Sequence, residues 1–254
     1  MHNKAFKSDS QRLAFSLRSS IAKRRSHLNA ALCLSRNGMI FDEWKNREIH
    51  KGKFFITDGV IDIERWEQSS FKILFILKEA YSGTPDSEGE WDLASYLNQG
   101  LHAVRGKMWK TVSQWCLGIQ KLVSSGEVCI FDEGYKGNIE FDDALRGCAV
   151  INLKKSSGYS SSNNADLRQY VESDWDLIEA QIDELKPDLI VCGSTWPLIK
   201  SKISHEKCGE WLYKSDRHYF VDFWHPANQY PNKLNYYSLL SALKLSIQKW
   251  RPET

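Results

Sequence analysis

Residues 72–77 of the chain read KILFIL, and this run decides the fold. An apolar run of this length, without polar alternation, is typical of a strand that is buried on both faces. Three further runs of the same kind follow along the chain: AVINL at 149–153, DLIVCG at 188–193 and YFVDF at 219–223. Helical patterns lie around them, at 92–124, 166–185 and 233–250. Buried strands that alternate with helices predict an α/β fold with three layers, in which helices cover both faces of a central, mostly parallel four-stranded sheet.

The composition is that of an ordinary globular protein. The 254 residues are 42% hydrophobic and carry a formal net charge of +2, so the overall charge does not indicate a nucleic-acid-binding protein. The six cysteines form no CxxC motif and no Cys/His cluster, and we expect neither a metal nor a cofactor. No run approaches the roughly 20 apolar residues of a membrane span, and there is no signal-peptide pattern. We therefore expect a reduced, cytoplasmic protein with no membrane partner and no obligatory protein partner.

The first 36 residues are strongly basic, with eight lysines and arginines and a single acid. Their apolar spacing suits an amphipathic helix, whose basic face either is solvated or contacts nucleic-acid phosphates. Residues 37–66 resemble short extended pieces separated by turns. We expect residues 1–66 to pack as a basic helix and extended segments on an α/β domain formed by residues 67–254, as one compact unit.

Polar residues stand where three of the four predicted strands end. Lys78 and Glu79 follow the first strand, the segment 152–155 (NLKK) ends the second, and His225 and Pro226 come just after the fourth. In open α/β sheets, ligands bind at the carboxyl ends of the strands. We therefore expect these residues to converge on one edge of the sheet.

Those residue types suit the hydrolysis of a bond to a heteroaromatic leaving group. The carboxylate of Glu79 can position or deprotonate a water molecule, and His225 can hydrogen-bond a departing anion. The amide of Asn152 carries both a donor and an acceptor for the edge of a base, and Tyr81 and Trp91 can stack on its ring. Each of these residues also has a structural interpretation, as a solvated loop carboxylate, a strand-end amide, a turn histidine or a packing ring.

Four motifs together resemble the uracil-DNA glycosylase superfamily over roughly residues 70–248. The first is FILKEAYSG, in which Lys78 to Tyr81 occupy the positions of the family's Gln-Asp-Pro-Tyr type motif. The others are AVINLKKSSG with Asn152, LKPDLIVCGSTW, and FVDFWHPANQYP with His225. The order and the spacing follow those of the family, and the resemblance implies a fold like that of uracil-DNA glycosylase.

The resemblance also implies a monofunctional DNA glycosylase, which flips a base out of DNA and leaves an abasic site. Glu79 and His225 would be the catalytic residues. The base would be contacted by Asn152, Tyr81, Trp91 and Lys78. The DNA would be contacted by Lys154, Lys155, Ser156, Ser157, Pro226, Asn228, Gln229 and Tyr230.

The sequence departs from the family pattern at Glu79, which replaces an Asp or Asn, at Lys78 and at Ala80. A bulkier, modified or damaged base fits these departures. Bacterial defence glycosylases that attack the modified bases of phage DNA belong to this superfamily, so a role in anti-phage defence is one specific hypothesis. Two alternatives remain open: a non-catalytic nucleic-acid- or nucleotide-binding module on the same fold, and a hydrolase that releases the base from free nucleosides or nucleotides.

Overall fold

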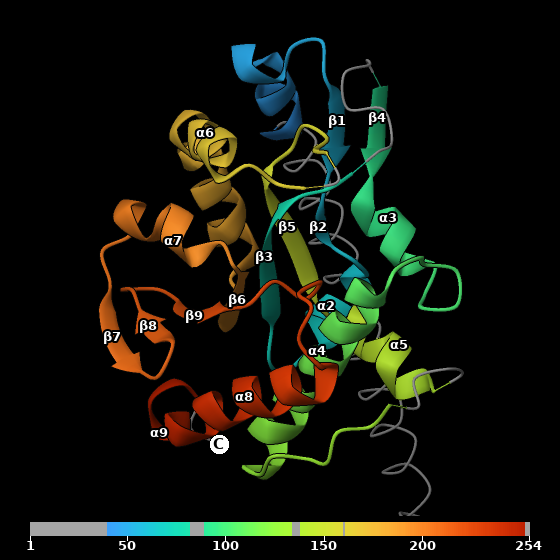
Figure 1. Ribbon diagram of the computed structural model, residues 1–254, viewed down its shortest axis with the longest axis vertical. Coiled ribbons are helices and arrows are strands. Elements are labelled where there is room, and N and C mark those ends of the chain that lie inside the picture. The colour runs from blue at the N-terminus through green and yellow to red at the C-terminus, as the bar shows by residue number, and fades with distance from the viewer. Residues whose placement is uncertain (1–39, 82–88, 134–137, 160, 252–254) are drawn as a thin grey trace, which may run out of the picture.

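The computed structural model describes residues 40–81, 89–133, 138–159 and 161–251 (Figure 1). The basic helix expected within the first 36 residues lies outside the described residues. A seven-stranded sheet runs through the molecule in the order β2-β5-β3-β6-β9-β8-β7. A separate two-stranded parallel sheet joins β1 (Phe54–Thr57) to β4 (Gly89–Asp92).

The four predicted strands all form, and they lie side by side at the centre of the sheet. They are β5 (Ala149–Lys154), β3 (Ile73–Glu79), β6 (Leu189–Gly193) and β9 (Tyr219–Phe223). Each pairs with its neighbour in parallel. The α/β class and the parallel pairing predicted from the apolar runs are thus confirmed, and these runs are buried on both faces as expected.

The sheet is nevertheless mixed and larger than the four strands expected. The short strand β2 (Gly59–Val60) pairs antiparallel with β5, and β8 (Leu212–Lys214) and β7 (Glu206–Gly209) extend the other side as an antiparallel hairpin. These three strands are short, and β7 and β8 are partly polar, so they carry no apolar run that a sequence pattern could detect.

Alternate residues of β3 divide the core into two layers. Ile73, Phe75 and Leu77 pack toward α4 (Lys107–Ser125) and α8 (Asn232–Leu245). Leu74 and Ile76 pack on the other face, toward α6 (Asn164–Leu185) and α7 (Trp196–Ile199). Because successive side chains of a strand point to opposite faces, a wholly apolar strand needs helices on both sides.

The other helices are short. They are η1 (Glu48–His50), α2 (Ile63–Gln68), α3 (Leu93–Asn98), α5 (Ile139–Arg146), η2 (Lys200–Lys202) and α9 (Ile247–Trp250). Hydrogen bonds from backbone amides to Asp62 and Asn163 cap the starts of α2 and α6, and α6 ends at Leu185, as the helical pattern at 166–185 predicted. No helix within the described part of the chain has the length and apolarity that crossing a membrane requires.

Two local predictions were wrong. Residues 40–46 form a helix rather than an extended piece, because Phe41 and Trp44 lie one turn apart and both bury their rings in the core beside α6. The helix predicted at 233–250 is divided into α8 and α9, and Leu234 near its start is 52% exposed. Tyr236 and Leu239 are buried there instead.

Candidate functional site

The parallel pairing brings the carboxyl ends of β5, β3, β6 and β9 to one edge of the sheet. Glu79 pairs in register with Lys154 across β3 and β5. Gly193, at the end of β6, leaves no room for a Cβ, because the side chains of Leu77 and Pro226 pack against it, with the Cα of His225 beside them. The structure therefore brings the predicted strand-end residues of three strands into one region, as the convergence argument required.

Glu79 is the last residue of β3, and its side chain is only 5% exposed. Its carboxylate lies 3.2 Å from the ammonium of Lys154, which also contacts the carboxylate of Asp166 at 2.7 Å. Gly158 packs directly on the carboxyl group of Glu79, and a Cβ at that position would overlap it. The Gly158 amide donates to the carbonyl of Ala80 at 2.8 Å, which fixes this contact. The ammonium of Lys154 on one side and the backbone of Gly158 on the other thus hold Glu79 in one position.

Lys154 belongs to this cluster rather than to the surface. Burial lowers the pKa of its ammonium, but the hydrogen bond with Asp166 and the charge of Glu79 raise the pKa by more, so the net pKa is raised. The ammonium therefore stays protonated and bridges the two carboxylates.

His225 follows β9 and has a defined tautomer. The amide of Ala227 donates to its Nδ1 at 3.2 Å, so the proton of the neutral ring is on Nε2. Burial, and to a lesser extent the charge of Lys78, lowers the pKa of His225 to about 4. At neutral pH the ring is uncharged and presents an Nε2–H donor.

The loop after His225 is held by a set of short polar contacts. The carbonyl of His225 accepts from the Asn228 side chain at 2.7 Å, and the Asn228 Oδ1 accepts from the Asn235 amide at 3.0 Å and from the Tyr230 backbone at 2.9 Å. Pro226 is buried, whereas Gln229 and Tyr230 are exposed. The loop thus presents two side chains to solvent on a fixed backbone.

Asn152 is 2% exposed and lies in a buried polar network. Its backbone amide and its Nδ2 both donate to Asp58, at 2.8 and 3.2 Å. Lys155 donates to the other oxygen of Asp58 at 2.5 Å and to Gln181 at 2.9 Å. Burial lowers the pKa of Lys155, and the charge of Asp58 opposes this effect. The ammonium also lies 4.5 Å from the ring of Trp44.

Ser156 is part of a second buried network. Its hydroxyl lies 2.6 Å from Nδ1 of His50, and Nε2 of the same ring lies 2.8 Å from Asp174. Burial raises the pKa of Asp174, but the hydrogen bond and charge of His50, together with contacts from the side chains of Trp44 and Ser173, lower it by more, so the net pKa is lowered. All three side chains are inaccessible to solvent, so this Ser–His–Asp arrangement stabilises the fold and has no route to a substrate.

The predicted DNA contacts from Lys154, Lys155, Ser156 and Ser157 have no support from their placement. All four residues are at most 6% exposed, and a phosphate cannot reach a side chain that is enclosed by protein. The sequence offered no warning of this, because a Lys-Lys-Ser-Ser run after a strand is usually solvated.

The two predicted stacking rings lie in different surroundings. Tyr81 is 59% exposed at the end of β3. Trp91 lies on β4 and packs against Tyr96, with ring centroids 5.2 Å apart, while its carbonyl accepts from Thr57. Trp91 is thus a partly buried ring that joins β4 to α3, and Tyr81 remains available to a ligand.

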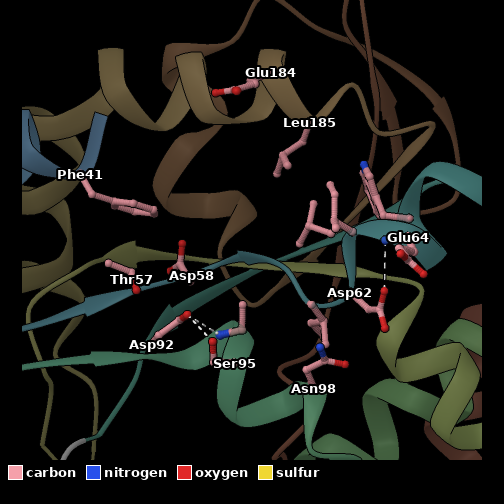
Figure 2. Close-up of a pocket in the computed structure, with 15 residues that line it drawn as sticks. Phe41, Thr57, Asp58, Asp62, Glu64, Asp92, Ser95, Asn98, Glu184 and Leu185 are labelled. Carbon is pink, nitrogen blue, oxygen red and sulfur yellow. Dashed lines mark hydrogen bonds between the residues drawn. The ribbon is translucent and has the colours of Figure 1, made fainter. Parts of the chain in front are cut away.

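A cavity of about 480 Å³ lies elsewhere, between the end of α6 and the starts of α2 and α3. Figure 2 shows Phe41, Glu184 and Leu185 on one side of it and Asp92 and Ser95 on the other. Its lining carries five carboxylates, from Asp58, Asp62, Glu64, Asp92 and Glu184. This concentration of negative charge repels phosphates, so the cavity is unsuited to nucleic acid.

The chain was compared with protein-family models, with characterised proteins and with solved structures, and none of the three comparisons found a match. Among the described residues, no group of three or more His, Cys, Asp or Glu side chains is placed to hold a metal ion. The geometry of the sheet edge is therefore the feature that points to a function.

Proposed function

We propose that this protein is a DNA glycosylase that extrudes a modified or damaged base and hydrolyses its N-glycosidic bond. The observation that carries the proposal is the presence, at one edge of the sheet, of Glu79, a fixed carboxylate at the end of β3, and of His225, a neutral imidazole that follows β9. A base and an uncharged donor in one region are the two groups that hydrolysis of a bond to a heterocycle requires.

In the proposed reaction, a water oxygen bonds to the sugar C1′ as the bond from C1′ to the base nitrogen breaks. The electron pair of that bond leaves with the base. Glu79 stabilises the positive charge that develops on the sugar and accepts the proton of the attacking water. The Nε2–H of His225 donates a hydrogen bond to the departing base as it becomes anionic. A neutral histidine suits this role because its Nε2–H can donate a hydrogen bond while the ring carries no charge at neutral pH.

Asn152 was expected to read the edge of the base, but it is only 2% exposed and, like Lys154 to Ser157, it is enclosed by protein, so we assign it a structural role below the sheet edge. Because Asp58 accepts from its Nδ2, the amide is oriented with Oδ1 directed away from that carboxylate. The loop that carries Gln229 and Tyr230 would contact the DNA and occupy the space left by the extruded nucleotide. A base that is modified in phage DNA is one substrate class that fits, and it would give the enzyme a role in defence.

One observation favours a second candidate, a nucleic-acid-binding module without activity. The Glu79 side chain is only 5% exposed and is paired with Lys154, which limits its access to a water molecule. A binding module would use the edge of the sheet and the loop after His225 without any need for a free carboxylate.

The deciding experiment is an abasic-site assay on a panel of DNA substrates, which includes uracil, mismatched thymine, hydroxymethylcytosine and glucosylated hydroxymethylcytosine. The wild type is compared with Glu79→Gln, which should fold normally because Lys154 keeps its contact with Asp166. Glu172→Gln, an exposed carboxylate of α6 that pairs with Lys202, is the matched control.

We expect alkali-labile sites from the wild type and from Glu172→Gln on at least one substrate, and none from Glu79→Gln. Equal cleavage by Glu79→Gln would remove the carboxylate from the mechanism. If no substrate is cleaved but DNA is bound, the binding module is the correct function.

A further inference from the structure

A cavity of about 440 Å³ at the carboxyl edge of the sheet is not used by the chemistry proposed above. It lies where β3, β6 and β9 end, against the first turns of α6 and α7. Its volume is in the range of sites that hold a small ligand. Two of its lining residues, Lys78 and Trp224, are the immediate neighbours of Glu79 and His225 along the chain, so the cavity adjoins the proposed catalytic edge.

The end of this cavity nearest α6 is cationic. Lys78 and Arg168 both line it, and Lys78 donates to the side chain of Asn164 at 3.3 Å. Neither cation forms an ion pair with any residue that the structure describes. Asn164 is the first residue of the 22-residue helix α6, whose amino end adds partial positive charge. This end suits a phosphate group.

The opposite end is aromatic. The ring centroids of Trp211 and Trp224 lie 6.2 Å apart, and the ring of Tyr230 packs at a tilt against Trp224, with centroids 4.9 Å apart. Trp224 and Tyr230 are 36% and 55% exposed, so both rings are accessible to a ligand. Exposed rings beside a cationic surface are the features with which proteins hold unpaired bases.

Backbone strain is concentrated at the same place. Among the residues that the structure describes, three non-glycine residues have positive φ, and two of them, Ser194 (57°) and Trp211 (56°), line this cavity. A left-handed backbone is costly for a residue with a bulky side chain and persists where its surroundings enforce it. The Ser194 amide donates to Phe223 at 2.7 Å, and the Trp211 carbonyl accepts from Asp222 at 2.8 Å. These bonds hold both residues at the cavity wall.

The two ends are separated by about the width of two strand spacings, roughly 10 Å, because β6 lies between β3 and β9. This separation places a phosphate and a base of the same nucleotide at opposite ends. Asp222 lies at the aromatic end, where its carboxylate repels phosphate and can accept a hydrogen bond from the amino group of a base. Thymine has no such amino group.

We propose that this cavity holds a second nucleotide of the DNA strand, next to the extruded one, with its phosphate against Lys78 and Arg168 and its base on Trp224. This inference depends on DNA being the substrate, as proposed above. The cavity would add a preference for a flanking cytosine, adenine or guanine over thymine, and it would require that base to be unpaired.

The test measures binding, so that it does not depend on base excision. Short fluorescent single strands of only cytosine or only thymine are titrated with the full-length protein, and anisotropy is followed at several salt concentrations. Trp224→Ala, Arg168→Ala and Asp222→Asn are compared with the wild type. Arg217→Ala removes an equal charge at the opposite edge of the sheet and serves as the control. Thermal unfolding of each variant verifies its fold.

We expect Trp224→Ala to weaken cytosine-strand binding roughly 5- to 150-fold, the range found for one lost stacking contact. Arg168→Ala should lower the slope of log K against log salt by about 0.7, the value for one phosphate on a single strand. Asp222→Asn should reduce the preference for the cytosine strand over the thymine strand. Arg217→Ala should change binding less than about twofold.

Wild-type affinity in both Trp224→Ala and Arg168→Ala would overturn the inference, and so would a wild type that binds neither strand. A wild type that binds through this cavity but releases no base from any substrate would contradict the glycosylase and leave the nucleotide site established. If the wild type releases a base and both variants bind normally, the glycosylase proposal is supported and the nucleotide site is contradicted.

Discussion

At the scale of single residues, the decisive contact is that of Glu79 with the backbone of Gly158. A catalytic carboxylate must be held close to its working position, since a small displacement of a reacting group lowers the rate strongly. Here a glycine and a paired lysine hold it, and neither residue needs to touch a substrate. Gly158 and Lys154 are therefore positioning residues in the proposed mechanism.

Gly158→Ala tests this arrangement. Its Cβ would overlap the Glu79 carboxyl group, so that side chain must move. We expect base release to fall about 10²-fold, in line with the loss from a misplaced group, and the melting temperature to change little. The abasic-site assay and thermal unfolding measure the two effects. Full activity in Gly158→Ala would show that the observed position of Glu79 is not the catalytic one.

His225→Ala tests the proposed donor. The neutral ring would lose its single Nε2–H, and we expect turnover to fall about 10²- to 10³-fold, the range for one donor to a developing anion. His225→Asn, which keeps an N–H donor, should recover part of that loss. Single-turnover kinetics separate the chemical step from binding. A fall of less than about threefold in His225→Ala would indicate that the ring has only a structural role.

At the scale of elements, the apolar strands could be predicted from the sequence, whereas the short edge strands and the buried polar contacts could not. A strand such as β3 is buried on both faces, so its composition alone reveals it, and parallel pairing then fixes which ends meet. The hairpin of β7 and β8 escaped prediction because strands of three or four residues at a sheet edge need few apolar side chains. The burial of Lys155 could not be predicted because its counterion, Asp58, lies 97 residues away in the chain.

The loop after β9 should depend on one side chain, that of Asn228. It accepts from Asn235 and Tyr230 and donates to His225. Removal of these bonds in Asn228→Ala should lower the free energy of unfolding by about 1–3 kcal/mol and reduce turnover by loosening His225. Denaturant unfolding and kinetics report the two effects. Gln229→Ala, at an exposed neighbour, should leave stability unchanged.

At the scale of the whole molecule, His225 makes stability depend on pH. Its pKa is about 4 in the fold and 6.5 in the unfolded chain, so the unfolded chain binds more protons between these values. Stability should therefore fall as the pH falls from about 6.5 to about 4. The contribution is at most about 3 kcal/mol, and less because the ring keeps some contact with water.

Urea unfolding of wild type and His225→Asn across this pH range measures the contribution. As the pH falls from about 6.5 to about 4, the free energy of unfolding of the wild type should decrease relative to that of His225→Asn. His102→Asn, which replaces an exposed histidine, controls for the general effect of acid. Parallel pH curves for wild type and His225→Asn would show that the ring titrates normally.

The buried pair of Lys155 and Asp58 has a consequence for how the chain can be divided. Asp58 and β2 both precede residue 67, where the α/β domain was expected to begin, yet they supply the counterion of Lys155 and the neighbouring strand of β5. A fragment of residues 67–254 would leave a buried ammonium unpaired, at a cost of about 3–5 kcal/mol, and would uncover the edge of β5. Open strand edges pair with those of other molecules, so such a fragment should aggregate rather than fold as a soluble monomer.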